Sequence, residues 1–169
     1  MALYLIANGP SPTTAAQVKV TTGTAIKTLL QVKPSATIAA KIIEWGVSFD
    51  GSTAATPGAV ELIETDVAAT VTAHAAAGIV KYDTAALIGG DPTTNLIQIG
   101  TTATGYTASG EGSITASRVL DVQLVAPTGQ YVKQFPLGRE PVLQVGLFGR
   151  IRVTFGAAIN AYAYMIVEV

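Results

Sequence analysis

The chain has 169 residues, a net charge of −1 at pH 7, and a composition that is 49% hydrophobic and only 12% charged. A chain of this length is expected to form one domain with a sizeable core. The near-neutral charge excludes the basic surface that nucleic-acid binding needs, and the apolar composition excludes a disordered chain. The absence of cysteine excludes a disulfide scaffold, a zinc finger and a thiol nucleophile.

We expect neither a secretory signal nor a membrane partner. No basic residue precedes the short apolar run at residues 2–6, whereas a secretory signal has a positive segment before a longer apolar one. The apolar stretches at 67–80 and 153–167 are both shorter than the roughly 20 residues that a transmembrane helix needs.

Residues 1–16 are predicted to form an N-terminal arm. Leu3–Ala7 could add one short strand to the edge of a neighbouring sheet. The sequence Asn-Gly-Pro-Ser-Pro at residues 8–12 then interrupts regular structure, because proline lacks a backbone donor and fixes φ.

From residue 17 onward, apolar and polar residues alternate, which is typical of strands with one buried and one wet face. Within residues 26–33 only Leu29 breaks the alternation, and Asp50-Gly51 is a strong turn signal. The predicted strands cover residues 18–20, 26–33, 43–49, 60–66, 120–124, 131–135, 147–155 and 162–166.

The middle of the chain has a weaker pattern. Residues 67–80 are rich in alanine, but Thr70, Val71 and Thr72 favour extended chain over helix. We expect one helical turn at 83–88 and a short strand at 96–99. The Gly, Thr and Ser residues of 101–112 predict a mobile loop.

These elements predict an all-β fold in which residues 17–169 form a single domain. About eight or more short antiparallel strands with frequent turn signals favour a β-sandwich, jelly-roll-like, or a small barrel. The N-terminal arm would precede this domain.

No catalytic constellation is visible in the sequence. His74 is the single histidine, and we expect it at the surface or half-buried in a strand of small residues. Glu61, Glu64 and Asp66 are expected on a solvated strand face, with a calcium site as the alternative. Trp45 is expected in the core, with a sugar-stacking platform as the alternative. We therefore predict no enzyme activity, no small-molecule substrate, no cofactor and no bound metal.

The low charge content suggests that part of the surface is covered in the working state, because charged residues are depleted at the cores of protein interfaces. Arginine is favoured at such interfaces because its planar guanidinium forms bidentate pairs. Arg150 and Arg152 share one strand face, where a cross-strand ion pair is the alternative to a partner contact. The predicted interface residues are Leu3, Leu5, Phe135, Arg139, Glu140, Arg150 and Arg152.

Four segments, at residues 18–33, 41–52, 60–66 and 127–141, resemble small virion proteins of tailed bacteriophages, namely head decoration or minor capsid proteins. The resemblance implies a β-sandwich on the capsid exterior, bound to the major capsid protein as a homo-trimer at local three-fold positions. It also implies synthesis in the host cytoplasm, and neither activity nor cofactor.

Two other functions remain open. One is a carbohydrate- or receptor-binding β-module, which needs exposed aromatic side chains on one face; Tyr162 and Tyr164 are the paired candidates, although packing within a sheet also explains them. The other is a different phage structural part, such as a tail or head-completion protein.

Overall fold

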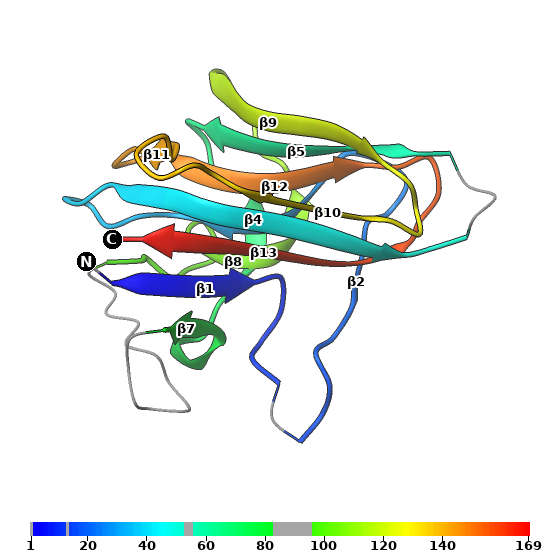
Figure 1. The fold of residues 1–169 in the computed structure, drawn as a ribbon, viewed down its shortest axis with the longest axis horizontal. Helices are drawn as coiled ribbons and strands as arrows, with labels where there is room; N and C mark the ends of the chain where they lie inside the picture. The colour runs from blue at the N-terminus through cyan, green and yellow to red at the C-terminus, as the bar shows by residue number, and fades with distance from the viewer. Residues whose placement is uncertain (1, 13, 53–55, 83–95) are drawn as a thin grey trace.

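The computed structural model describes residues 2–12, 14–52, 56–82 and 96–169, which form two antiparallel sheets of seven and six strands packed as a β-sandwich (Figure 1). The two sheets do not close into a barrel. The predicted all-β fold is therefore confirmed, and of the two predicted architectures the sandwich is the one observed.

The seven-stranded sheet has the spatial order β10-β4-β13-β1-β7, and two short strands, β11 and β2, pair with β4 and β13. Its strands, in chain order, are β1 (Leu3–Ala7), β2 (Val20–Thr21), β4 (Ala40–Asp50), β7 (Ile79–Lys81), β10 (Gln130–Gln134), β11 (Val142–Leu143) and β13 (Asn160–Glu168).

The six-stranded sheet has the order β6-β8-β3-β12-β5-β9, so that β6 and β9 are its edges. Its strands, in chain order, are β3 (Lys27–Val32), β5 (Gly58–Thr65), β6 (Thr70–Ala73), β8 (Gly105–Gly110), β9 (Ser117–Val125) and β12 (Phe148–Thr154). A 3₁₀ turn, η1 (Ala76–Gly78), lies between β6 and β7.

The first part of the predicted N-terminal arm, β1, is a strand of this same domain. β1 lies between β13 and β7, and Tyr4 and Ile6 are fully buried in the core. Ala2 and Val169 exchange two backbone hydrogen bonds of 2.7 and 2.9 Å, so the first and last described residues lie side by side. Tyr4 and Ile6 supply apolar area to the core, which explains why the segment pairs internally instead of reaching for a neighbour.

Alternating side chains fill the space between the sheets as the sequence predicts, and Trp45 is fully buried among them. Where the alternation fails, the structure has a bulge. Leu29 is the extra residue between Leu30 and Thr28 in the register with β12, and Ile43 is the extra residue on β4 opposite β13. A bulge lets two successive residues share one side of a strand, so Leu29 and Leu30 are both in the core.

The middle of the chain differs from two of the predictions. The segment predicted as a mobile loop, residues 101–112, contains strand β8, which joins β3 to β6. Residues 96–99 form no strand but only two isolated bridges, Ile97 with Pro34 and Ile99 with Thr104. The extended chain predicted for 67–80 is present as β6 and part of β7. The helical turn predicted at 83–88 lies outside the described residues.

Candidate functional site

Strand β9 exposes several large apolar side chains to solvent. Three of its apolar residues, Val119, Val122 and Leu124, point away from the sandwich, whereas Asp121 points inward and is buried. The other two apolar residues of this strand, Leu120 and Val125, pack against the core. Val122 is 51% exposed and Leu124 is 77% exposed. The alternation of Leu120, Val122 and Leu124 with Asp121 predicts these three apolar residues to be buried. Only Leu120, the extra residue of a bulge in the pairing with β5, packs against the core. We call Val119, Val122 and Leu124 the β9 face.

Asp121 explains why β9 keeps this register. Its carboxylate accepts a hydrogen bond of 2.9 Å from the Tyr131 hydroxyl and lies 3.4 Å from the Lys133 ammonium, both on β10 of the other sheet. Burial, followed by the bond to Asp121, raises the pKa of Tyr131, so its hydroxyl remains a donor at neutral pH. A buried carboxylate with these partners ties the edges of the two sheets together.

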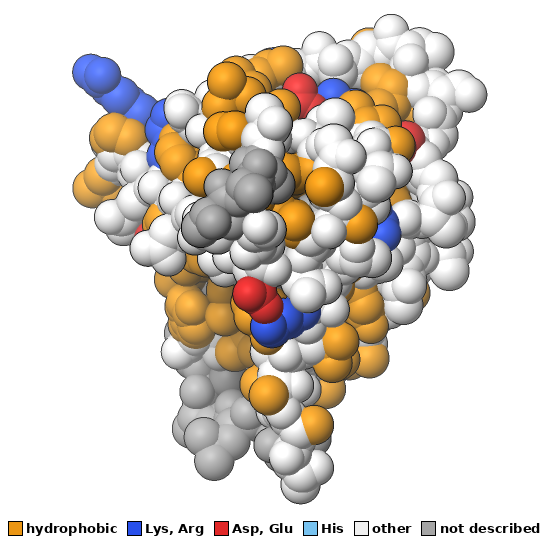
Figure 2. All heavy atoms as spheres, turned by 90° about the vertical axis from the view of Figure 1, so that its right-hand side faces the viewer, with side chains coloured by type: hydrophobic (Ala, Val, Ile, Leu, Met, Phe, Trp, Pro, Cys, Tyr) orange, Lys and Arg blue, Asp and Glu red, His pale blue; other side chains and the backbone are white. Residues whose placement is uncertain are grey.

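The charges beside the β9 face are neutralised within the chain. Arg118 of β9 lies 2.6 Å from the buried carboxylate of Glu64. Glu61, which is paired in register with Val122, accepts a 2.8 Å hydrogen bond from Arg152. The face therefore consists of an apolar strip next to paired charges. On the face of the molecule shown in Figure 2, charged side chains are likewise few and scattered among hydrophobic and neutral ones.

The bend at residues 135–141 contains three of the predicted interface residues. Arg139 is exposed, as a contact residue must be, and Leu137 beside it is 98% exposed. Glu140 is half-buried and accepts a 2.9 Å hydrogen bond from the Gly138 amide, so it stabilises its own turn. Phe135 packs against the core, and its exposure is partial.

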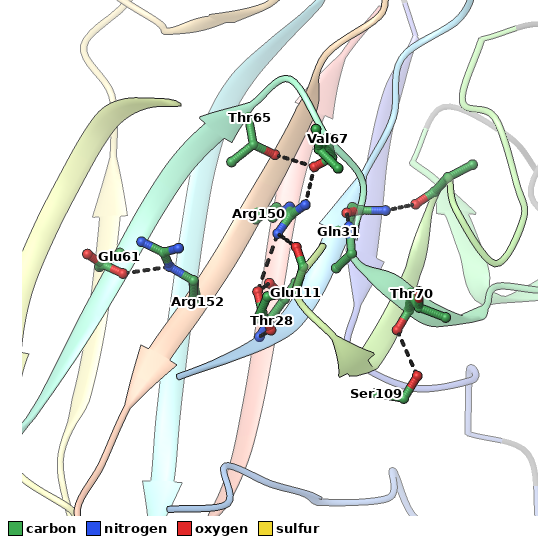
Figure 3. Close-up of polar contacts among 12 residues, drawn as sticks. Thr28, Gln31, Glu61, Thr65, Val67, Thr70, Ser109, Glu111, Arg150 and Arg152 are labelled. Atoms are coloured by element: carbon green, nitrogen blue, oxygen red, sulfur yellow. Dashed lines mark hydrogen bonds and ion pairs between the residues drawn. The ribbon is translucent and has the colours of Figure 1, made fainter. Parts of the chain in front are cut away.

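Arg150 is corrected from a partner contact to a buried structural residue, because its side chain has no exposed surface. It lies on the outer face of the six-stranded sheet but beneath the chain that crosses there (Figure 3). Its guanidinium donates to the Val67 carbonyl and to the Glu111 carbonyl, the latter at 3.0 Å, and lies 3.3 Å from the Glu111 carboxylate. Burial lowers the pKa of Arg150, and the charge of Glu111 opposes that shift.

The carboxylate of Glu111 fastens its own segment to the sheet. It accepts hydrogen bonds of 2.6 Å from both the amide and the hydroxyl of Thr28. Gln31, three residues after Thr28 on β3, donates to the Ala103 carbonyl at 2.5 Å and accepts from the Ala69 amide at 2.8 Å. These contacts, drawn in part in Figure 3, close the crossing segments over the sheet. Arg152 forms the cross-strand ion pair with Glu61 that was the alternative for this strand.

A second surface feature is an open groove on the outer face of the seven-stranded sheet. It has a volume of about 400 Å³. We call it the tyrosine groove. Its main lining residues are Leu5, Glu44, Tyr82, Tyr162, Tyr164 and Ile166. Leu5 was predicted at an interface and lies in this groove, and Leu3 is half-buried on the same strand.

The ring of Tyr164 is held in place from two sides. It lies against Gly46 of β4, where an added Cβ would be 2.5 Å from the ring carbon Cε1. Its hydroxyl donates a 2.5 Å hydrogen bond to Glu44 Oε1. Burial and this bond raise the pKa of the Tyr164 hydroxyl, which therefore stays protonated. The neighbouring Tyr162 donates a 2.6 Å hydrogen bond to the Gln17 carbonyl.

The remaining candidate groups each have a separate structural role. His74 is buried, contrary to the prediction, and its Nε2 lies 2.7 Å from the Ala7 carbonyl. Glu64 is buried as well, whereas Asp66 accepts hydrogen bonds from the Thr115 hydroxyl and the Ala116 amide. Among the described residues no three such side chains are placed to hold a metal ion. No helix in that part of the chain is long and apolar enough to span a membrane.

Comparison with known proteins gives no match: no family model, no curated protein and no solved structure is similar to this chain.

Sequence analysis did not find the contributions of Glu44 and Tyr82 to the groove. Glu44 lies on a strand far from Tyr164 in sequence, and only the pairing of β4 with β13 brings them together. The β9 face was missed for another reason. The alternation of apolar and polar residues in β9 is visible in the sequence, but the sequence does not show which of the two sets of side chains faces the solvent.

Proposed function

We propose that the chain is a structural protein of a tailed-bacteriophage particle, which binds the outside of the capsid as a trimer and covers its β9 face in doing so. The observation that carries this proposal is the outward direction of Val122 and Leu124 on a nine-residue edge strand. Natural edge strands are normally kept short or protected by charge, proline or a covering segment.

The nature of the surface favours a protein neighbour. Arg118 and Asp121 on β9 are both neutralised within the chain, so neither supplies a free charge. The strand is also an edge of the six-stranded sheet, with β5 as its pairing partner among the described strands. An apolar strip beside a free strand edge suits strand addition or close subunit packing. The particle as the setting is proposed from the four sequence segments at residues 18–33, 41–52, 60–66 and 127–141.

Assembly is tested by light scattering of the purified chain over a concentration series. We expect a mass near three chains for the wild type, and a lower mass for Leu124→Lys, because a lysine cannot be covered without its charge being desolvated. Thr72→Lys on β6, the opposite edge of the same sheet, is the matched control and should retain the wild-type mass. A wild-type monomer at all concentrations, or a Leu124→Lys variant of unchanged mass, would contradict the trimer.

Capsid binding needs a separate measurement, namely sedimentation of the chain with heads assembled from the major capsid protein alone. The proposal expects the wild type and Thr72→Lys to sediment with the heads, and Leu124→Lys to remain in the supernatant. Wild-type protein that stays in the supernatant at saturating head concentration would refute the assignment to the capsid.

A further inference from the structure

We propose that the tyrosine groove of one copy of the chain receives the exposed turn around Leu137 of a second copy, so that the copies join head to tail. We call residues 136–140 the Leu137 turn. The inference rests on the trimer of the proposed function and names one of its contacts. A ring of three copies related by a three-fold axis needs two different patches on each chain, one of which fits the other.

The first patch is the Leu137 turn, which holds an apolar side chain out in the solvent. Leu137 is 98% exposed. The Arg139 amide donates a 2.9 Å hydrogen bond to the Pro136 carbonyl, and Gly138 has a φ of 80°, which is the pattern of a type II turn. The Gly138 amide is also bound by the Glu140 carboxylate at 2.9 Å. A turn that is already ordered loses little conformational entropy when it binds.

The second patch is the tyrosine groove, whose lining is mainly apolar. Leu5 of β1 and Ile166 of β13 are paired in register and half-buried, and Tyr82, which also lines the groove, is 50% exposed. A cavity of about 150 Å³ is enough for benzene, so the groove, with about 400 Å³, has room for a leucine side chain. Insertion of Leu137 removes apolar area of both copies from water, which favours association.

The charges of the two patches are complementary. Arg139 is exposed and forms no ion pair within the described part of the chain. Glu44 is the acidic residue of the groove lining; its Oε1 accepts the Tyr164 hydroxyl, and no described lysine or arginine is paired with it. Because Arg139 is two residues from Leu137, it meets Glu44 when Leu137 enters the groove. Such a pair fixes the orientation in which the two surfaces dock.

The positions of the two patches suit a contact between copies. The Leu137 turn connects β10 to β11 at one edge of the seven-stranded sheet, whereas the groove lies over β13 and β1, toward the edge formed by β7. No residue of the turn lines the groove of its own chain. One copy therefore offers its turn to the next and keeps its groove open for a third, which is the heterologous contact that closes a ring.

The test is a disulfide trap, which the absence of cysteine from the chain makes specific. Leu137→Cys is mixed with Tyr82→Cys or with Leu5→Cys in a glutathione buffer, at the protein concentration used for light scattering. We expect a mixed disulfide dimer with at least one of the two groove variants, and much less dimer from any single variant alone. Ile38→Cys, at a residue that is 46% exposed and lies outside both patches, is the matched control for Leu137→Cys and should stay at background.

Charge reversal tests the contact of Arg139 with Glu44 in the same assay. Arg139→Glu in the Leu137→Cys chain should lower the equilibrium constant of the mixed disulfide at least about tenfold, because two carboxylates then meet. Glu44→Lys in the groove chain should restore it to within about threefold of its original value. The fluorescence of the buried Trp45 shows whether each variant is folded.

The outcomes separate this inference from the proposed function. The inference is overturned, even if light scattering gives a mass of three chains, when neither groove variant exceeds the Ile38→Cys control. It is also overturned when Leu137→Cys alone dimerises as well as the mixtures do, or when Arg139→Glu has no effect. If the mixed disulfide forms as expected in a protein that scatters as a single chain, the contact stands and the stable trimer of the proposed function does not.

Discussion

Replacement of Glu111 by alanine should destabilise the fold strongly, because it leaves the buried Arg150 without its bonded counter-charge. The Arg150 side chain has no exposed surface, and the Glu111 side chain is only 20% exposed. Removing one partner of a buried ion pair costs about 3–5 kcal/mol. Arg150 keeps its bonds to two backbone carbonyls, while Thr28 loses two hydrogen bonds to the carboxylate. We therefore expect Glu111→Ala to lower the free energy of unfolding by about 3 kcal/mol.

The matched control is the neighbouring pair on the same strand, Arg152 with Glu61. Their side chains are 18% and 21% exposed, so both ions keep some hydration. The cost of Glu61→Ala should therefore be about 1 kcal/mol or less. The comparison separates the effect of full burial from the effect of losing an ion pair on β12.

The assay is urea unfolding at one protein concentration, followed by the fluorescence of Trp45, which is the single tryptophan and is fully buried. With a slope of about 2 kcal/mol per molar urea, the midpoint of Glu111→Ala should fall by about 1.5 M. The double variant Arg150→Met/Glu111→Leu should be more stable than Glu111→Ala alone, since it removes the buried charge together with its partner. The reasoning is refuted if Glu111→Ala costs no more than Glu61→Ala.

Two further predictions concern β1 and His74. Ile6→Ala should lower the free energy of unfolding by about 2–5 kcal/mol because it opens a cavity in the core. Leu5→Ala, on the outer side of the same strand, should lower it clearly less. Equal losses in urea unfolding would contradict the internal position of β1. Burial lowers the pKa of His74. Because Nε2 faces the Ala7 carbonyl, Nε2 carries the proton of the neutral ring. A second proton would have to bind Nδ1, which is buried and has no partner among the described residues. The unfolded chain then binds more protons below about pH 6.5, so the stabilisation should be complete above that pH and should decline as the pH falls below it. This decline should vanish in His74→Gln, and its persistence there would assign it to other groups.

The sequence predicted the strands well because the alternation of apolar and polar residues is a local signal. It also marked one of the bulges, since Leu29 breaks the pattern at the point where the register of β3 with β12 shifts. β8 was missed because its residues Gly105 to Gly110 are those of a loop, and only pairing with β3 and β6 makes them a strand.

The candidate surfaces were less predictable because they depend on what covers each strand. Arg150 and Arg152 look equivalent in sequence, yet the chain around Val67 and Glu111 crosses over Arg150, whereas the Arg152 side chain remains 18% exposed. Similarly, the alternation at Val122 does not reveal that Asp121 faces inward, because that choice is made by Tyr131 and Lys133 on another sheet.

The position of β1 has a consequence for the order in which the protein takes shape during synthesis. β1 pairs along its length with β13, which leaves the ribosome after every other described strand. At about 5–20 residues per second, the first strand waits roughly 8–30 seconds for its partner. β4 waits for β13 as well, so the seven-stranded sheet is completed only after translation has passed residue 168. Until then Tyr4 and Ile6 remain uncovered, which makes this chain a candidate for protection by a chaperone while it is being made.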